Sequence, residues 1–132
     1  MPFAEFTDDL RVGHDEIDRQ HLGLFEAINC LHDALRAGRS RQEQTDILAF
    51  LHTYTVEHFQ TEEAVMRDSG YPALEAHQEL HRTLVQQVND LEEKYALGTM
   101  TLSIMTMHFL KDWLTNHIQA EDQKFAAFRR AK

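Results

Sequence analysis

The sequence predicts an all-α fold: an antiparallel up-and-down four-helix bundle with an irregular N-terminal arm and a short C-terminal helix. Only two prolines, Pro2 and Pro72, and five glycines interrupt the 132 residues, so long stretches contain no helix breaker. Apolar residues in those stretches recur at intervals of three and four, which places them on one helix face. The connections are short, and short connections make neighbouring helices run in opposite directions.

The first half of the chain predicts two helices. After an arm that extends to about Gly13, we expect Asp15 to cap a first helix that ends near Gly38. A second helix should begin near Ser40 and stop at the segment 69–72, Ser-Gly-Tyr-Pro. The inward stripes are expected to contain Leu22, Phe25, Ile28, Leu31 and Leu35 in the first helix, and Ile47, Leu51, Tyr54 and Val65 in the second.

The second half predicts two more helices. The third should run from about Leu74 to Tyr95, before Gly98, and the fourth should begin near Thr101. The inward positions are expected to be Leu84, Val88 and Leu91 in the third helix and Leu102, Met105, Phe109 and Trp113 in the fourth, with Phe125 and Phe128 closing the bundle end.

Composition limits the possible classes of protein. With 42% hydrophobic residues, we expect residues 1–132 to form a single domain with its own core. The formal net charge of −9 argues against nucleic acid as a partner. We expect no transmembrane segment, a cytoplasmic location and a monomer. Cys30 cannot form an intramolecular disulfide, and we expect it to be a small buried hydrophobe.

Five polar side chains interrupt the core stripes. His58 and Glu62 are four residues apart, as are His77 and His81, so each pair projects from one helix face, and His117 joins them from the fourth helix. Leaving such groups buried without partners costs about 1 to 3 kcal/mol each. A bound metal satisfies them all, so the pattern favours a metal site in the bundle interior.

The full set of candidate ligands adds His21, which an antiparallel bundle places at the same end, and Asp122, which lies five residues beyond His117. Seven ligands exceed the four that zinc takes, and the mixture of imidazoles with two carboxylates suits two iron ions. Asp122 lies about 140° around an ideal helix from His117. It can therefore share a metal with His117 only if the helix loosens near Ala120. We expect the remaining histidines, His14, His32, His52 and His108, at the surface or in polar networks outside the site.

These residues resemble the hemerythrin family, in particular the single-domain bacteriohemerythrins. The resemblance rests on the segments 17–21 (Ile-Asp-Arg-Gln-His), 58–63, 77–81, 113–118 and Asp122, and it covers nearly the whole chain. It departs from the family at Phe6, where many bacterial members have Trp, and at His14, where an aliphatic residue is usual.

Carried over position by position, the resemblance implies a non-haem diiron centre with an oxo or hydroxo bridge. One iron would be held by His77, His81 and His117, and the second, with an open position, by His21 and His58. Glu62 and Asp122 would bridge the two ions. The walls of the O2 pocket would be Leu24, Phe59, Trp113, Leu114 and Ile118.

The activity that the resemblance implies is reversible O2 binding by a carrier rather than an enzyme. Such a carrier would store or transport O2, or deliver it to an oxygen-consuming enzyme such as an oxygenase. Two alternatives stay open: an O2 or redox sensor, and a diiron enzyme that acts on peroxide or nitric oxide.

Overall fold

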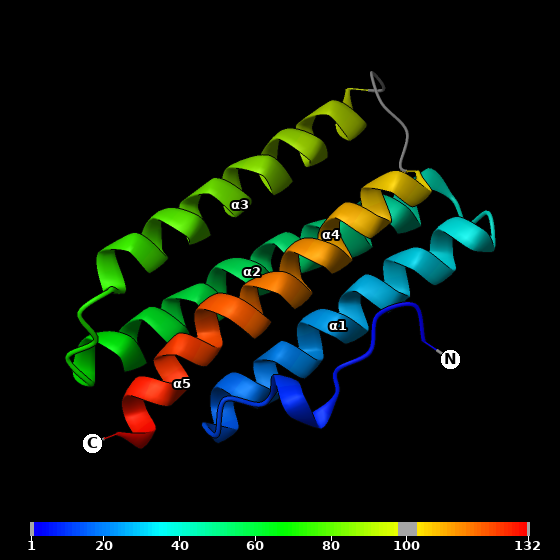
Figure 1. Ribbon diagram of the computed structural model, residues 1–132. Helices are drawn as coiled ribbons and strands as arrows, with labels where there is room; N and C mark the ends of the chain where they lie inside the picture. Colours follow the sequence, from blue (N-terminus) through cyan, green and yellow to red (C-terminus); the bar gives the residue numbers. More distant parts are fainter. Residues whose placement is uncertain (1, 98–102, 132) are drawn as a thin grey trace.

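The computed structural model describes residues 2–97 and 103–131, and it confirms the all-α four-helix bundle (Figure 1). No strand occurs within the described residues. The helices are α1 (Asp15–Arg36), α2 (Arg41–Asp68), α3 (Leu74–Ala96) and α4 (Ile104–His117), followed by a π-helical turn (Ile118–Asp122) and the short α5 (Gln123–Arg130). The predicted end of the third helix at Gly98 and the predicted start of the fourth at Thr101 lie outside the described residues.

Local sequence explains where the helices begin and end. Gly38 and Gly70 have φ angles of +66° and +72°, a backbone region in which glycine has no Cβ penalty, and each lies two residues beyond the last residue of a helix. Ser40 and Ser103 cap α2 and α4, since their side chains accept a backbone N–H of the first turn. The expectation that Asp15 caps α1 is wrong, because His14 Nδ1 accepts the Ile17 N–H at 3.3 Å.

The N-terminal arm lies along α1 and is tied to it by side chains of that helix (Figure 1). Asn29 accepts from the Ala4 N–H at 2.7 Å and donates to the Ala4 carbonyl at 2.8 Å. Asp18 accepts from the backbone N–H groups of Val12 at 2.8 Å and Gly13 at 3.2 Å. These bonds hold the arm across one side of the bundle.

The apolar core consists of two clusters with a polar layer between them. The larger cluster includes Leu24, Phe59 and Ile118, and the smaller includes Ile17 and Met66. His21 therefore lies between the clusters in α1, and Glu62 does so in α2. Asp122 also lies between the clusters, because it follows Ile118 of the larger cluster and precedes Phe125 of the smaller one.

Several predicted core positions are wrong. Met105 is 79% exposed and Phe109 40%, because a step of four residues advances 400° and so drifts about 40° from a straight stripe. Counting back from His117 in three such steps places Met105 about 120° away from the ligand face. The buried side of α4 instead contains Met107, Leu110, Leu114 and His117. Leu102 lies outside the described residues.

Two expectations for α1 are also wrong. Leu22 is 42% exposed and Cys30 is exposed. At 100° per residue, Cys30 lies about 180° from His21, on the side of α1 that faces away from the core. Apolar neighbours in sequence did not reveal this, because helical phase rather than local composition decides burial.

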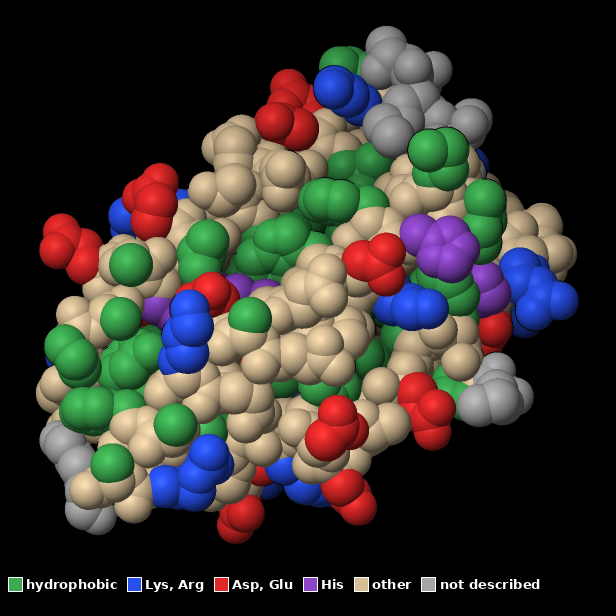
Figure 2. Space-filling view, in the orientation of Figure 1, with side chains coloured by type: hydrophobic (Ala, Val, Ile, Leu, Met, Phe, Trp, Pro, Cys, Tyr) green, Lys and Arg blue, Asp and Glu red, His purple; other side chains and the backbone are tan. Residues whose placement is uncertain are grey.

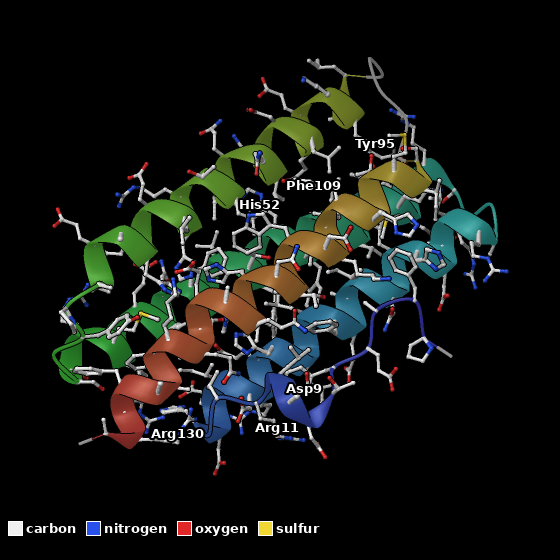
Figure 3. The ribbon with its side chains drawn as sticks, in the orientation of Figure 1. Asp9, Arg11, His52, Tyr95, Phe109 and Arg130 are labelled. Carbon is white, nitrogen blue, oxygen red and sulfur yellow. The ribbon has the colours of Figure 1, made fainter. Side chains whose placement is uncertain are left out.

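The four other histidines lie outside the polar layer. His52 pairs with Glu92 at 2.6 Å on the α3 side of α2, where Figure 3 labels it. His108 is exposed and His14 caps α1. His32 is buried and its ring stacks on Phe3 at a centroid distance of 4.0 Å, a contact that the sequence did not predict.

A groove of about 310 Å³ runs between α3 and α4, and Phe109 lines it together with Val88 and Leu91 (Figure 3). Figure 2 shows apolar side chains gathered in this region and acidic side chains scattered over the same face. None of the helices within the described residues combines the length and the hydropathy that crossing a membrane requires.

Candidate metal centre

Seven polar side chains converge at one level of the bundle interior. They come from α1 (His21), α2 (His58 and Glu62), α3 (His77 and His81), the end of α4 (His117) and the π-helical turn (Asp122). Each is at most 6% exposed. The structure thus brings together all seven residues that the sequence singled out as candidate ligands.

Three imidazoles form one group around a pair of carboxylate oxygens. The Nε2 atoms of His77 and His81 lie 2.9 and 3.2 Å from Glu62 Oε1. Those of His77 and His117 lie 3.0 and 3.2 Å from Asp122 Oδ1. The ligand atoms of these five residues all lie within 4.8 Å of one another, a spacing compatible with a single ion between them.

Two imidazoles form a second group around the other oxygens of the same carboxylates. The Nε2 atoms of His21 and His58 each lie 3.3 Å from Glu62 Oε2. His21 Nε2 also lies 3.2 Å from Asp122 Oδ2. Each carboxylate therefore presents one oxygen to the group of three histidines and the other to the group of two.

The π-helical turn is what brings Asp122 to this position. On a regular α-helix its side chain would point about 140° away from His117, whereas a π-helical turn inserts one more residue per turn and reduces that angle. Within the turn Asp122 is 1% exposed and contacts His117. The expected loosening of the helix near Ala120 is confirmed.

The electrostatics of the protein part of the site are strongly coupled. Burial alone lowers the pKa of His21 and of His77, but the nearby Asp122 and Glu62 outweigh burial and raise each pKa to about 9. Burial alone raises the pKa of Glu62, yet the surrounding histidines hold it well below its ordinary value. The pKa of His58 is lowered by burial. Burial and the charge of Glu62 raise the pKa of Asp122, but the surrounding histidines outweigh them and hold it well below its ordinary value. Both carboxylates thus remain ionised, as metal ligands must be.

The site passes a test of fit for metal ions. Within the described residues, five buried side-chain atoms have no hydrogen-bond partner, and all belong to candidate ligands: both ring nitrogens of His21, Oε2 of Glu62 and both oxygens of Asp122. Buried polar atoms are normally satisfied. Imidazole nitrogens and carboxylate oxygens in this number suit cations of the first transition series, so the residues present fit a pair of metal ions.

Two further residues support the histidines from behind, and sequence reasoning missed both roles. Gln20 accepts from His58 Nδ1 at 2.9 Å, and Glu63 accepts from His81 Nδ1 at 2.7 Å. Each stands directly beside a ligand in the sequence, next to His21 and Glu62. Adjacent residues point about 100° apart on a helix, so sequence order gives no hint that each supports a histidine on another helix.

An almost wholly apolar cavity of about 20 Å³ lies within the larger apolar cluster, and its lining includes neighbours of the candidate ligands but none of the ligands themselves. Three of the five residues predicted to wall the O2 pocket line it: Leu24, Phe59 and Leu114. The other two lie close to the ligands instead, since the Trp113 ring stacks on His117 at 4.6 Å and Ile118 is fully buried beside it in the chain. Phe59 also stacks on His81 at 3.7 Å.

Comparisons with known proteins agree with this arrangement. A model of the hemerythrin HHE cation binding domain matches residues 12–128. Bacteriohemerythrin from Stenotrophomonas maltophilia is 33% identical over 127 residues, covering 96% of this chain and 81% of that protein. Bacteriohemerythrin from Methylococcus capsulatus is 37% identical over 108 residues, or 82% of each. The crystal structure of a wild-type hemerythrin, 32% identical, superposes with a TM-score of 0.89 over 95% of this chain and 96% of that one.

Proposed function

The chain belongs to the hemerythrin HHE cation binding family, and on this premise we propose that its metal centre holds two iron ions and binds O2 reversibly. The observation that carries the proposal is the division of the two carboxylates. Glu62 places one oxygen beside His77 and His81 and the other beside His21 and His58. A carboxylate divided in this way is suited to bridge two ions.

The two ions would have unequal surroundings. His77, His81 and His117 would hold one ion, and His21 and His58 the other, while Glu62 and Asp122 serve both. The side with two histidines lacks one protein ligand, so it is where we place the open position for O2. Iron held by these residues would supply the electrons that O2 takes up on binding and returns on release.

The protein residues around the site favour reversible binding over further chemistry. Only two carboxylates are present to donate negative charge, which leaves the ions less electron-rich than a carboxylate-dominated site would. The neighbouring cavity is lined by Leu24, Phe59 and Leu114, with Thr55 as its polar member. Thr55 Oγ1 already donates to the Leu51 carbonyl at 2.7 Å. Such a cavity admits a small apolar molecule and holds water poorly.

The size of the same cavity supports a carrier role. Its volume of about 20 Å³ is far below that of sites that bind organic substrates. We therefore propose that the protein stores or transports O2, or delivers it to an oxygen-consuming enzyme such as an oxygenase, and does not itself transform a substrate.

The test is anaerobic reduction of the iron-loaded protein, exposure to O2 and then removal of O2, followed by visible absorption. We expect a coloured form with O2 and recovery of the colourless form over repeated cycles. Irreversible oxidation at the first exposure would contradict a carrier role. The loaded His52→Gln variant is the matched control, because His52 pairs with Glu92 outside the site.

A further inference from the structure

The hydrogen bonds behind the candidate ligands differ in charge between the two sides of the centre. His81 Nδ1 donates to Glu63 Oε2 at 2.7 Å, so the group of three histidines is supported by a carboxylate. His58 Nδ1 donates to Gln20 Oε1 at 2.9 Å, so the group of two histidines is supported by a neutral amide. The two hydrogen bonds have nearly the same length, but the acceptor carries a full negative charge in the first and is neutral in the second.

Both supporting side chains are held in place by a second hydrogen bond. Gln78 Nε2 donates to Glu63 Oε1 at 3.2 Å, which fixes the carboxylate on the α2–α3 side of the bundle. Gln20 Nε2 donates to Thr61 Oγ1 at 3.2 Å. Because the amide nitrogen is used there, the amide oxygen faces His58, which fixes the donor and acceptor roles of that contact.

The remaining imidazole on the side with two histidines has no support within the described residues. Both ring nitrogens of His21 are buried without a hydrogen-bond partner, and its ring neighbours are the His58 ring at 4.4 Å and the Phe6 ring at 6.3 Å. No carboxylate therefore contacts the outer nitrogen of either His21 or His58 among the described residues. Apart from the shared Glu62 and Asp122, the carboxylate that accepts from a candidate ligand among the described residues is Glu63, on the other side.

We propose that Glu63 and Gln20 are positioning residues of unequal charge, which make the ion beside His77, His81 and His117 easier to oxidise than the ion beside His21 and His58. The inference rests on the proposed diiron function. A carboxylate behind a ligand histidine raises the basicity of that ligand and favours the higher charge on the ion. A neutral amide orients the ring without this effect. The ion beside His21 and His58 is then the harder one to oxidise, and this is the side where we place the open position for O2.

The test exchanges the two supporting groups and measures reduction potentials. Glu63→Gln and Gln20→Glu each keep an acceptor oxygen on a side chain of the same length and change its charge, and Gln20→Glu also removes the amide donor to Thr61 Oγ1. In anaerobic redox titrations of the iron-loaded protein, Glu63→Gln should shift the midpoint to more positive values and Gln20→Glu to more negative ones. We expect a change of about tenfold in the reduction equilibrium, or about 59 mV for one electron.

Glu57→Gln is the matched control, because Glu57 is an exposed carboxylate on α2, the helix that carries Glu63. It should leave the midpoint within a few millivolts of the wild type. Loaded variants at positions 63 and 20 with the wild-type midpoint, or with shifts in the same direction, would overturn the inference. If Glu63→Gln takes up no iron, the midpoint of Gln20→Glu becomes the test. A midpoint that does not shift to more negative values would then overturn the inference.

Failure of the proposed function has a different signature. A wild-type protein without two irons fails in the metal analysis, before any potential is measured, and removes the basis of this inference too. Opposite shifts in a loaded protein that is oxidised irreversibly by O2 would support the unequal charges and overturn the carrier role. Reversible O2 binding without opposite shifts would support the carrier role and overturn the unequal charges.

Discussion

Removing the metal should make the stability of the protein fall as the pH rises above neutrality. In the metal-free site the carboxylates of Asp122 and Glu62 keep His21 and His77 protonated, and the pKa of each is raised to about 9 although burial opposes this. An unfolded histidine has a pKa near 6.5. The stabilisation is therefore complete below pH 6.5 and is lost as the pH passes through about 9.

The magnitude follows from the size of the shift. A shift from 6.5 to about 9, at about 1.4 kcal/mol per pKa unit, gives about 3 kcal/mol for one histidine. His21 and His77 share the same two carboxylates, so the loss for the pair is smaller than twice this value. His58 does not enter this pH window, because burial lowers its pKa and its effect appears only below 6.5.

The assay is urea denaturation of the chelated, metal-free protein at pH 6.5 and pH 9.5, followed by circular dichroism. We expect the free energy of unfolding to fall by about 3 kcal/mol between the two. The His52→Gln variant should show the same fall, since His52 lies outside the site, whereas His21→Gln should show a smaller one. A free energy of unfolding that is flat or rises over this range would show that Asp122 and Glu62 do not keep His21 and His77 protonated in the folded protein.

Three further predictions concern the site, the cavity and the arm. Glu62→Ala should lower iron affinity at least about tenfold in equilibrium dialysis, whereas His52→Ala should not, because Glu62 contacts both groups of histidines and His52 contacts neither. Leu24→Ala should cost about 2 to 5 kcal/mol in urea denaturation, since Leu24 is 2% exposed, and it should speed oxidation of the O2-bound protein. An unchanged free energy of unfolding together with an unchanged oxidation rate would contradict the role of the cavity. Asp18→Ala should cost about 1 to 3 kcal/mol of stability and increase hydrogen exchange at the Val12 and Gly13 amides, because it removes their acceptor. Asp15→Ala, at an exposed position in the same turn, should leave the exchange of these amides unchanged.

The candidate ligands were predictable because their spacing has a direct geometric meaning. Residues four apart share a helix face, so the sequence alone pairs His58 with Glu62 and His77 with His81. Asp122 was informative for the opposite reason, since its spacing from His117 fits no regular helix. That mismatch predicted a break or wide turn near Ala120, and the structure has a π-helical turn over residues 118–122.

Features that depend on helical phase or on contacts between distant segments could not be predicted in the same way. Met105 and Phe109 follow a plausible four-residue spacing, and only accumulated drift places them at the surface. The stacking of Phe3 on His32 depends on how the arm folds back, which no local pattern specifies. Likewise Gln20 and Glu63 stand beside ligands in sequence, but each supports a histidine on another helix.

Crystals of the iron-loaded protein would show whether the seven residues hold two iron ions in unequal surroundings. Anomalous diffraction at the iron absorption edge, with metal analysis of the same sample, should show two irons per chain. One peak should lie beside His77, His81 and His117, and the other beside His21 and His58, with Glu62 and Asp122 between them. A single peak, or one zinc ion and no iron, would contradict the account.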